Sequence, residues 1–187
     1  MTEFDNFSVC NSFGTDVKGK GKLAEEDFIN YFYNNPKNNG KTLHDVRNNP
    51  LYQDIDIDFI IDNDGFETLP NIDEVIYNKS RFIKVEVKYN GCALNTGKYA
   101  FEVISHSNLG WGVDTKCDYI YTLFGQNNSD GSYTPLKRGI INFEEWKKFI
   151  KNKNNYRKVN YNKGENVIVD ILTDINDMIK NGILIFV

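Results

Sequence analysis

Two charged side chains in the middle of the chain have types and spacing that could support catalysis. In the segment FIKVEVKYN, Glu86 and Lys88 are two residues apart within a strand-like apolar run. Because side chains alternate across a strand, the two groups would share one face. Hydrolysis of a phosphodiester calls for a hard cation, an activated water and stabilisation of the charge at phosphorus. A carboxylate beside an ammonium group suits that chemistry, although a solvated strand face is the common alternative.

Three aspartates precede this pair. The segment YQDIDIDFII alternates strictly, which predicts a strand with its acidic side chains on one face: Asp54, Asp56 and Asp58. Asp is disfavoured in strands, and three like charges on one face repel. A bound cation or nearby lysines would account for such a row, whereas an exposed strand edge is the alternative. Antiparallel pairing with the FIKVEVKYN strand could bring the acids and Glu86 into register.

A predicted helix carries a further acidic candidate, Glu25. The segment GKLAEEDFINYFYNN has the spacing of an amphipathic helix, in which Glu25 shares a face with Phe28 and Ile29. Glu25 should therefore point toward the sheet, where a carboxylate needs a partner. A bound cation or Lys88 would serve, and the alternative is a boundary glutamate paired with a surface lysine.

The remaining elements are predicted by periodicity and by capping residues. We expect two strands around the turn at 78–80, strands at 98–106 and 118–124, and a turn at 127–133. A capping box of Asn142 and Glu145 opens a helix, and a second capped helix from Asp170 ends at Gly182, before a short strand. This order predicts an α/β (α+β) fold with a central mixed β-sheet flanked by helices. With no repeat or linker, residues 1–187 are expected to form a single domain.

Four segments together resemble the PD-(D/E)XK nuclease superfamily, which includes restriction endonucleases, phage exonucleases and Holliday-junction resolvases. Gly21 and Glu25 match the Gly-x-x-x-Glu spacing of its first helix, and VEVK matches its Glu-x-Lys signature. The segment YQDIDIDFII resembles the strand that ends in the metal-binding aspartate. The strand–turn–strand unit that follows in phage and bacterial members is similar to the segments TGKYAFEVIS, GWG and DYIYTLF. The resemblance covers a core of about residues 19–124. No proline precedes the aspartates, and the interval from Asp58 to Glu86 requires an inserted loop.

The resemblance implies a restriction-endonuclease-like fold and a metal-dependent nuclease, in the first place a DNA endonuclease of phage or bacterial type. Asp58 is the favoured metal ligand because it directly precedes apolar strand residues, with Asp56 second and Asp54 third. Mg²⁺ or Mn²⁺ would be held by Asp58, Glu86 and the carbonyl of Val87. Lys88 would activate water or stabilise charge. The implied catalytic set is Glu25, Asp58, Glu86 and Lys88.

Other interpretations stay open. One is a catalytically inactive protein with a nuclease fold that binds nucleic acid or has a regulatory role. Another is an interaction domain whose acidic strand faces a protein partner. Glu102, on the next predicted strand, is a weaker candidate for the site. Trp111, in the GWG turn, is expected in the core rather than as a platform for bases.

Basic residues suggest where nucleic acid would bind. The segment from Lys137 to Lys163 holds nine basic residues and two acidic ones, although the net charge of the chain is −4. Trp146, Tyr156 and Tyr161 lie among them, in a C-terminal part at about 137–187 that is expected to be basic and helical. The predicted phosphate contacts, which would set affinity rather than sequence choice, are Lys18, Lys20, Lys22, Lys147, Lys148 and Lys151. A solvated helix and loop would explain the same charges.

Composition and short motifs argue against membrane, secreted, zinc-binding and nucleoside-triphosphate-binding proteins. The 187 residues are 40% hydrophobic, yet no apolar run approaches the length of a membrane helix. The N-terminus lacks a basic-then-apolar signal, and three scattered cysteines (Cys10, Cys92 and Cys117) suit reduced thiols, so a cytoplasmic location in a bacterial or phage-infected cell is expected. His44 and His106 lack zinc-site spacing, and KGKGK lacks the end of a phosphate-binding loop. A homodimer is an expectation by analogy with the superfamily.

Overall fold

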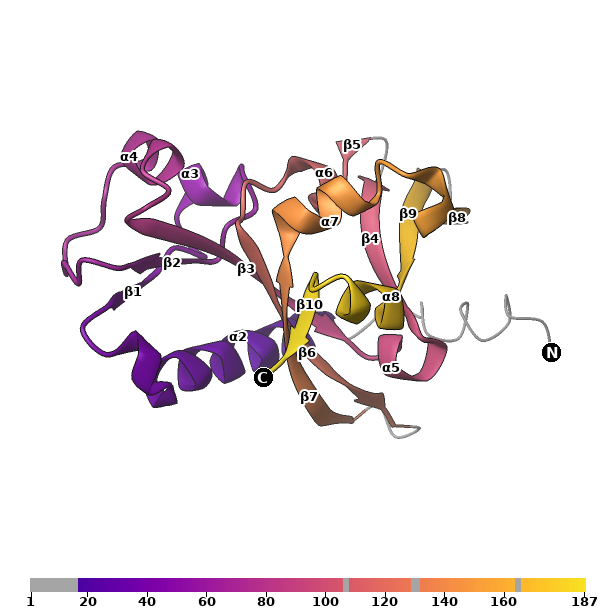
Figure 1. Cartoon of the computed structure of the whole chain (residues 1–187), viewed down its shortest axis with the longest axis horizontal. Coiled ribbons are helices and arrows are strands. Elements are labelled where there is room, and N and C mark those ends of the chain that lie inside the picture. Colours follow the sequence, from indigo (N-terminus) through magenta and orange to yellow (C-terminus); the bar gives the residue numbers. More distant parts are fainter. Residues whose placement is uncertain (1–16, 106–107, 129–131, 164–165) are drawn as a thin grey trace.

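The computed structural model describes residues 17–105, 108–128, 132–163 and 166–187. Within these ranges the strands form a six-stranded sheet in the order β1-β2-β3-β6-β7-β10 and a four-stranded sheet in the order β5-β4-β9-β8 (Figure 1). The strands of the larger sheet are β1 (Thr42–Asp45), β2 (Phe59–Asp62), β3 (Phe82–Asn90), β6 (Tyr119–Asn127), β7 (Tyr133–Asn142) and β10 (Leu184–Phe186). Those of the smaller sheet are β4 (Lys98–Ser105), β5 (Asn108–Leu109), β8 (Tyr156–Lys163) and β9 (Asn166–Asp174).

The helices are mostly short and lie between the strands. They are α2 (Val17–Asn34), α3 (Pro50–Gln53), α4 (Ile72–Tyr77), α5 (Ala93–Thr96), α6 (Trp111–Asp114), α7 (Phe143–Phe149) and α8 (Ile175–Lys180), with 3-10 turns η1 (Pro36–Asn38) and η2 (Lys153–Asn155). In the larger sheet β3 runs parallel to β6, whereas the other neighbouring strands are antiparallel. The prediction of a mixed α/β fold with a mixed central sheet flanked by helices is therefore confirmed.

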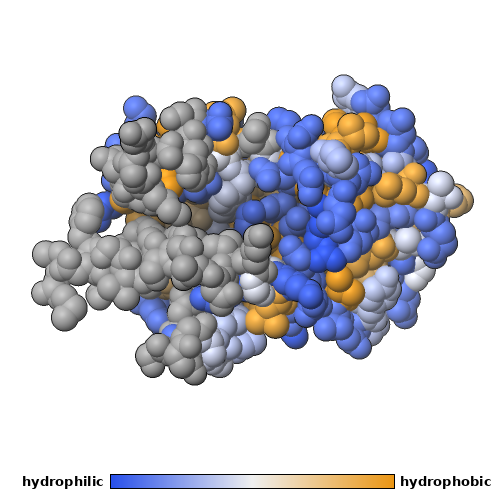
Figure 2. All heavy atoms as spheres, turned by 180° about the vertical axis from the view of Figure 1, so that it is seen from behind, coloured by the Kyte–Doolittle hydropathy of each residue, from blue (hydrophilic) through white to orange (hydrophobic). Residues whose placement is uncertain are grey.

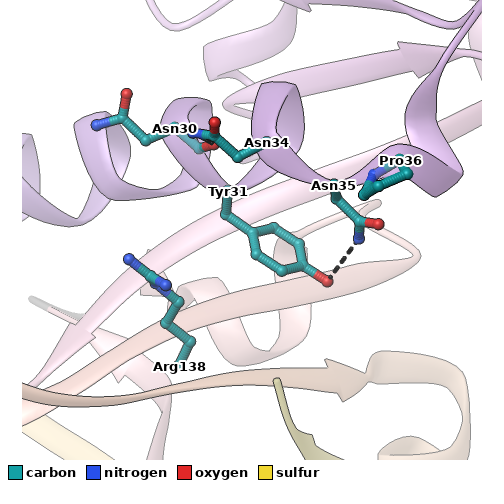
Figure 3. Close-up of a pocket in the computed structure, with 6 residues that line it drawn as sticks. All are labelled: Asn30, Tyr31, Asn34, Asn35, Pro36 and Arg138. Atoms are coloured by element: carbon teal, nitrogen blue, oxygen red, sulfur yellow. Dashed lines mark hydrogen bonds between the residues drawn. The ribbon is translucent and has the colours of Figure 1, made fainter.

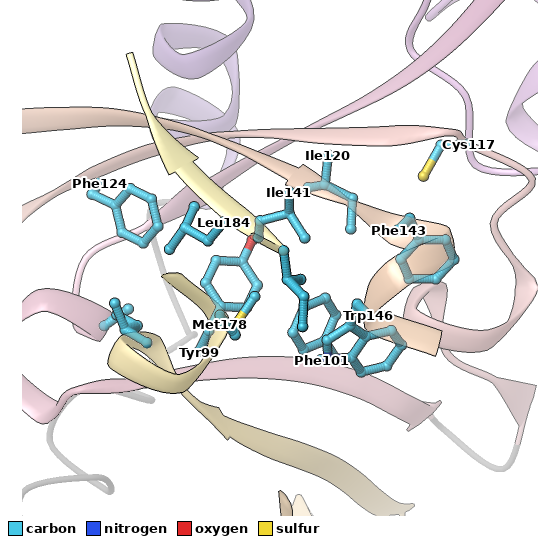
Figure 4. Packing of buried hydrophobic residues seen from close by; sticks show 13 residues of the cluster. Tyr99, Phe101, Cys117, Ile120, Phe124, Ile141, Phe143, Trp146, Met178 and Leu184 are labelled. Carbon is cyan, nitrogen blue, oxygen red and sulfur yellow. The ribbon is translucent and has the colours of Figure 1, made fainter. Parts of the chain in front are cut away.

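The two faces of β3 meet different partners. Val85 and Val87 pack with Ala24 and Phe28 of α2, so this helix covers one face of the larger sheet. The opposite face, which carries Glu86, faces a second apolar cluster that joins the larger sheet to β4, α7 and α8 (Figure 4). Its largest members include Phe101 and Trp146, which stack with ring centroids 3.8 Å apart. Glu86 and Lys88 therefore lie on the side of the larger sheet that faces the smaller one.

One predicted cap is present in half of its expected form. Asn142 Oδ1 accepts a hydrogen bond from the backbone N–H of Glu145 at 3.2 Å, which opens α7 as predicted. The reciprocal bond of a capping box is replaced, because the Asn142 N–H donates to the carbonyl of Ile183. The Glu145 carboxylate accepts from Lys148 instead.

Three predicted elements are wrong in part. The strand expected from Tyr52 begins only at Phe59, because Asn49 caps the short helix α3 and Pro50 occupies its first turn. The strand expected before the turn at 78–80 is helix α4, which Asn71 caps. The last helix starts at Ile175 and not near Asp170, which belongs to β9. The C-terminal part at 137–187, expected to be helical, contains residues of β7 and the strands β8, β9 and β10 beside the short helices α7 and α8. Each error replaces a strand with a short capped helix or the reverse, where periodicity has too few residues to decide.

Candidate functional site

The pairing of β2 with β3 brings the predicted metal-binding carboxylates together. Phe59 is opposite Val85, so continuing this antiparallel register by one residue sets Asp58 opposite Glu86. The Asp58 N–H donates to the Val85 carbonyl at 3.1 Å, and the Asp58 side chain accepts from the Val87 N–H at 2.8 Å. Residues directly opposite in such a pair share a face. Asp58 and Glu86 are close enough for each carboxyl group to affect the pKa of the other.

Lys88 completes this group. Its ammonium forms an ion pair with Glu86 Oε1, and it also acts electrostatically on Asp58. The Lys88 side chain is 28% exposed to solvent, whereas Glu86 as a whole residue is only 3% exposed. The structure therefore brings together three of the four predicted catalytic residues, with the lysine at the open end.

Burial controls the proton affinity of the two acids. Burial raises the pKa of Glu86 to about 8; Lys88 acts against this rise, and Asp58 adds to it. Burial also raises the pKa of Asp58, against the Lys88 charge and the Val87 N–H. The pKa of Lys88 is raised too, because its attraction to Glu86 and Asp58 outweighs the effect of burial. An added positive charge at this point would favour ionisation of both acids.

The donor set fits a hard divalent cation. Glu86 Oε2 is buried and receives no hydrogen bond from any described residue, which leaves one lone-pair-bearing oxygen without a partner. Among the described residues no group of three or more His, Cys, Asp or Glu side chains is arranged around a metal position. Mg²⁺ typically takes only one or two carboxylates and completes its shell with water and substrate phosphate. Asp58 and Glu86 supply that number.

Glu25 lies near this group but has its own partner. Its carboxylate forms an ion pair with Arg47, which also binds Asp45 through Nε at 2.8 Å. Glu25 is still near enough to Asp58 to raise the pKa of that acid. The partner expected from the sequence was Lys88 or a cation, so the Arg47 pairing differs from that prediction. The cause is the turn after β1, which directs Arg47 toward α2.

The aspartate row divides into separate environments. Asp54 ends α3 and is exposed, whereas Asp56 has a left-handed backbone with φ 50°, which Asp tolerates better than most residues. Asp56 lies close enough to affect the charges of both Glu86 and Lys88. The predicted shared strand face is therefore wrong, because the chain leaves α3 through a turn and becomes extended only near Asp58.

Two residues of this face were missed by sequence reasoning. Lys84 is 2% exposed, and its ammonium lies 2.8 Å from Asp118, whose carboxylate also accepts the Lys84 backbone N–H. Period-two alternation from Glu86 could have found Lys84. Nothing in the sequence indicates that Asp118 reaches it, since that contact depends on the parallel pairing of β3 with β6.

Glu102 is not brought to the site. Phe101 packs toward the larger sheet in the apolar cluster shared with Tyr99, and Glu102 alternates with Phe101 along β4. Its side chain is therefore expected on the face of the smaller sheet that points away from the larger sheet.

The predicted phosphate contacts are scattered. Lys20 lies 5.9 Å from the Tyr89 ring centroid, on the α2 side of the larger sheet. Lys22 lies 3.8 Å from Glu26, and on α7 Lys147 and Lys148 pair with Glu144 and Glu145. Lys151 is exposed. The side chains of Lys18, Tyr161 and Lys163 lie outside the described part of the chain, as do Cys10 and His106.

The expectation that Trp146 lies on a nucleic-acid-binding surface in the basic segment is wrong. This residue is 0% exposed and stacks between Phe101 and Phe143 in the core, so it cannot present a ring to nucleic acid. The basic residues are also divided between faces, because Lys137 and Arg138 are adjacent on β7 and point to opposite sides. Arg138 is bound by Asp27 of α2, at 2.8 and 2.9 Å.

A surface pocket lies on the other side of the sheet. It has a volume of about 340 Å³ and is lined by residues of α2, its C-terminal turn and β7, namely Asn30, Tyr31, Asn34, Asn35, Pro36 and Arg138 (Figure 3). In this view the Asn35 amide donates to the Tyr31 hydroxyl at 3.3 Å. Since α2 covers the face of Val85 and Val87, the pocket is separated from Glu86 by the sheet.

Hydrophilic residues occupy most of the described surface in the view of Figure 2, and hydrophobic residues form separate patches on it. None of the described helices combines the length and apolar character needed to cross a bilayer. Comparisons with protein-family models, with curated proteins and with solved structures found no match to this chain.

Proposed function

We propose that this chain is a divalent-metal-dependent nuclease that hydrolyses phosphodiester bonds, with DNA as its substrate and a restriction-endonuclease-like fold. One observation carries the proposal. Asp58, directly before β2, and Glu86 of β3 are 28 positions apart in the sequence but close enough for each to affect the pKa of the other, and the buried oxygen Glu86 Oε2 has no donor among the described residues. The Glu-x-Lys spacing then puts Lys88 beside them.

Three groups of this chain would hold Mg²⁺ or Mn²⁺. Two are the carboxylates of Asp58 and Glu86. The third is the Val87 carbonyl, because carbonyls two residues apart on a strand point the same way, and that of Val85 already accepts the Asp58 N–H. The Val87 carbonyl is therefore directed to the Asp58 side of β3. When bound, the cation supplies Lewis acidity at a phosphate oxygen and lowers the pKa of a coordinated water.

Lys88 supplies the remaining charge. Its ammonium is paired with Glu86 and its side chain is partly exposed, so it can hold a water molecule or offset negative charge that develops on a phosphate. A second positive charge at the carboxylates would weaken the Lys88–Glu86 attraction and release the ammonium toward substrate.

A second candidate is an inactive nuclease-fold protein that binds nucleic acid. The Lys88–Glu86 ion pair favours it, because this pair compensates the buried charge without a metal ion. The two candidates differ in whether divalent ions bind and whether cleavage follows.

The test is cleavage of supercoiled, linear, branched and single-stranded DNA with Mg²⁺, with Mn²⁺ and with neither. We expect metal-dependent cleavage that falls roughly 100- to 10,000-fold in Asp58→Asn, Glu86→Gln and Lys88→Met, the range typical of lost acid–base or charge stabilisation. Asp54→Asn is the matched control, because Asp54 is an exposed neighbour of the same type. Variants that fold and cut as fast as the parent would overturn the assignment. DNA binding without any cleavage would favour the second candidate.

A further inference from the structure

We propose that Trp111 is a positioning residue of the candidate site, whose indole face holds the Lys88 ammonium group beside Asp58 and Glu86. This inference rests on the proposed function for its catalytic meaning, but the contact itself stands on the geometry. Lys88 Nζ lies 5.0 Å from the centroid of the Trp111 ring. A cation at this distance over an indole face is attracted by the negative face of the ring.

The two glycines that flank Trp111 fix the position of this ring. A Cβ at Gly110 would overlap the carbonyl oxygen of Glu102, and one at Gly112 would lie 2.8 Å from the same oxygen. Gly110 also donates its N–H to the Val103 carbonyl at 3.1 Å. The backbone of α6 can therefore lie directly against β4 only because both flanking residues lack a side chain. This accounts for the GWG sequence.

The Trp111 ring also packs against a neighbouring aromatic side chain. Trp111 packs on Phe101 of β4 with ring centroids 5.5 Å apart and an interplanar angle of 38°. The indole is partly buried against the apolar cluster between the sheets. Since Phe101 is itself 0% exposed, the indole packs against a fully buried side chain.

The segment after Trp111 is tied to the same site at successive points. Thr115 Oγ1 donates to the Asp56 carbonyl at 2.8 Å, and the Lys116 N–H donates to the Ile55 carbonyl at 3.0 Å. Asp118 receives Lys84, as described above. Residues 110–118 therefore pack beside β3 and the turn that holds Ile55 and Asp56. Within this segment, Trp111 is the residue that contacts Lys88.

This arrangement gives the lysine two favourable neighbours, the Glu86 carboxylate and the indole face. Occupation of the carboxyl pair by a divalent cation would repel the ammonium from Glu86, whereas an aromatic face carries no formal charge and would keep it. Trp111 would thus hold Lys88 at the reacting phosphate instead of allowing it to extend into solvent.

The first test is a double-mutant cycle in the metal-free protein. Urea unfolding is measured for the parent, Lys88→Met, Trp111→Leu and the double variant. We expect the two changes to be coupled by a factor of roughly 3 to 30 in the folding equilibrium constant, the range of cation–π contacts from exposed to desolvated sites. Trp111→Phe, which keeps an aromatic face, should recover part of the coupling.

The matched control is Lys84→Met combined with Trp111→Leu. Lys84 lies on the same face of β3 but is bound to Asp118, so its effect and that of Trp111 should add. Additive effects for Lys88 and Trp111 would overturn the proposal.

The second test uses cleavage kinetics. Trp111→Leu should lower kcat roughly 3- to 30-fold with KM nearly unchanged, and Trp111→Phe should restore most of the rate. Equal loss in the leucine and phenylalanine variants, or a change in KM alone, would contradict a positioning role. If the parent cuts no nucleic acid at all, the proposed function fails, and the unfolding cycle still decides whether Trp111 holds Lys88.

Discussion

The Glu86 carboxyl group combines burial, a second carboxyl beside it and one ammonium partner. Of these influences, burial is the largest and holds its pKa at about 8. In the unfolded chain the group would titrate near its ordinary value of 4.5. Between these two values the folded protein binds more protons than the unfolded chain, so the free energy of unfolding must fall as pH rises.

We therefore predict that the metal-free protein loses stability between about pH 5 and about pH 8, and that Glu86→Gln flattens this dependence. Asp58, whose pKa is also raised, adds to the effect in the same direction. Urea unfolding at several pH values measures it. The slope with pH is the quantity to compare, because the substitution also changes the partner of Lys88. An equal slope in the parent and the variant would show that Glu86 does not carry the shift.

At the scale of residues, the sequence predicted the contact between Glu86 and Lys88. Alternation alone places Glu86 and Lys88 on one face, and the structure has them there. It could not predict that Arg47 would take Glu25, because that contact depends on the turn after β1. Trp111 was expected in the core, and it is packed there on one side while its face meets Lys88.

At the scale of elements, the position of α6 depends on glycine. We predict that Gly110→Ala lowers the free energy of unfolding by about 1–3 kcal/mol, because the added methyl group meets backbone and not a movable side chain. Urea denaturation measures this change.

Gly21→Ala is the control. Gly21 lies inside α2 with nothing within 4 Å of an added Cβ, so alanine should stabilise the protein by about 0.5–1 kcal/mol. A Gly110→Ala protein as stable as the parent would show that the close approach of α6 to β4 is not required.

The short elements show what local patterns can and cannot predict. The long helix α2 and the strands β3, β4 and β6 follow from periodicity over many residues. In α3 and α4, the caps Asn49 and Asn71 were readable signals, but the alternation after Tyr52 and the apolar run before the turn at 78–80 outweighed them. The pairing of β4 with β9, which builds the smaller sheet, joins segments about 70 residues apart, and no local pattern specifies it.

At the scale of the whole molecule, basic charge is distributed over several elements. Lys151 is exposed and has no ion-pair partner among the residues described, whereas Lys22 lies beside Glu26. We predict that Lys151→Ala lowers the salt dependence of DNA binding, by about 0.9 in the slope of log K against log salt for one phosphate contact. Lys22→Ala should change it less.

Fluorescence anisotropy with a labelled duplex, without divalent ions, measures these slopes. Unchanged slopes in both variants would place the DNA surface elsewhere on the molecule, with Lys20 as the next residue to test.

Divalent-ion binding tests the central claim most directly. Calorimetric titration of Mn²⁺ into the parent should show one site, and Asp58→Asn and Glu86→Gln should each abolish it or weaken it by at least about 10-fold. Asp54→Asn should bind as the parent does. Binding of equal strength in all four proteins, or no binding to the parent, would contradict a metal site shared by Asp58 and Glu86.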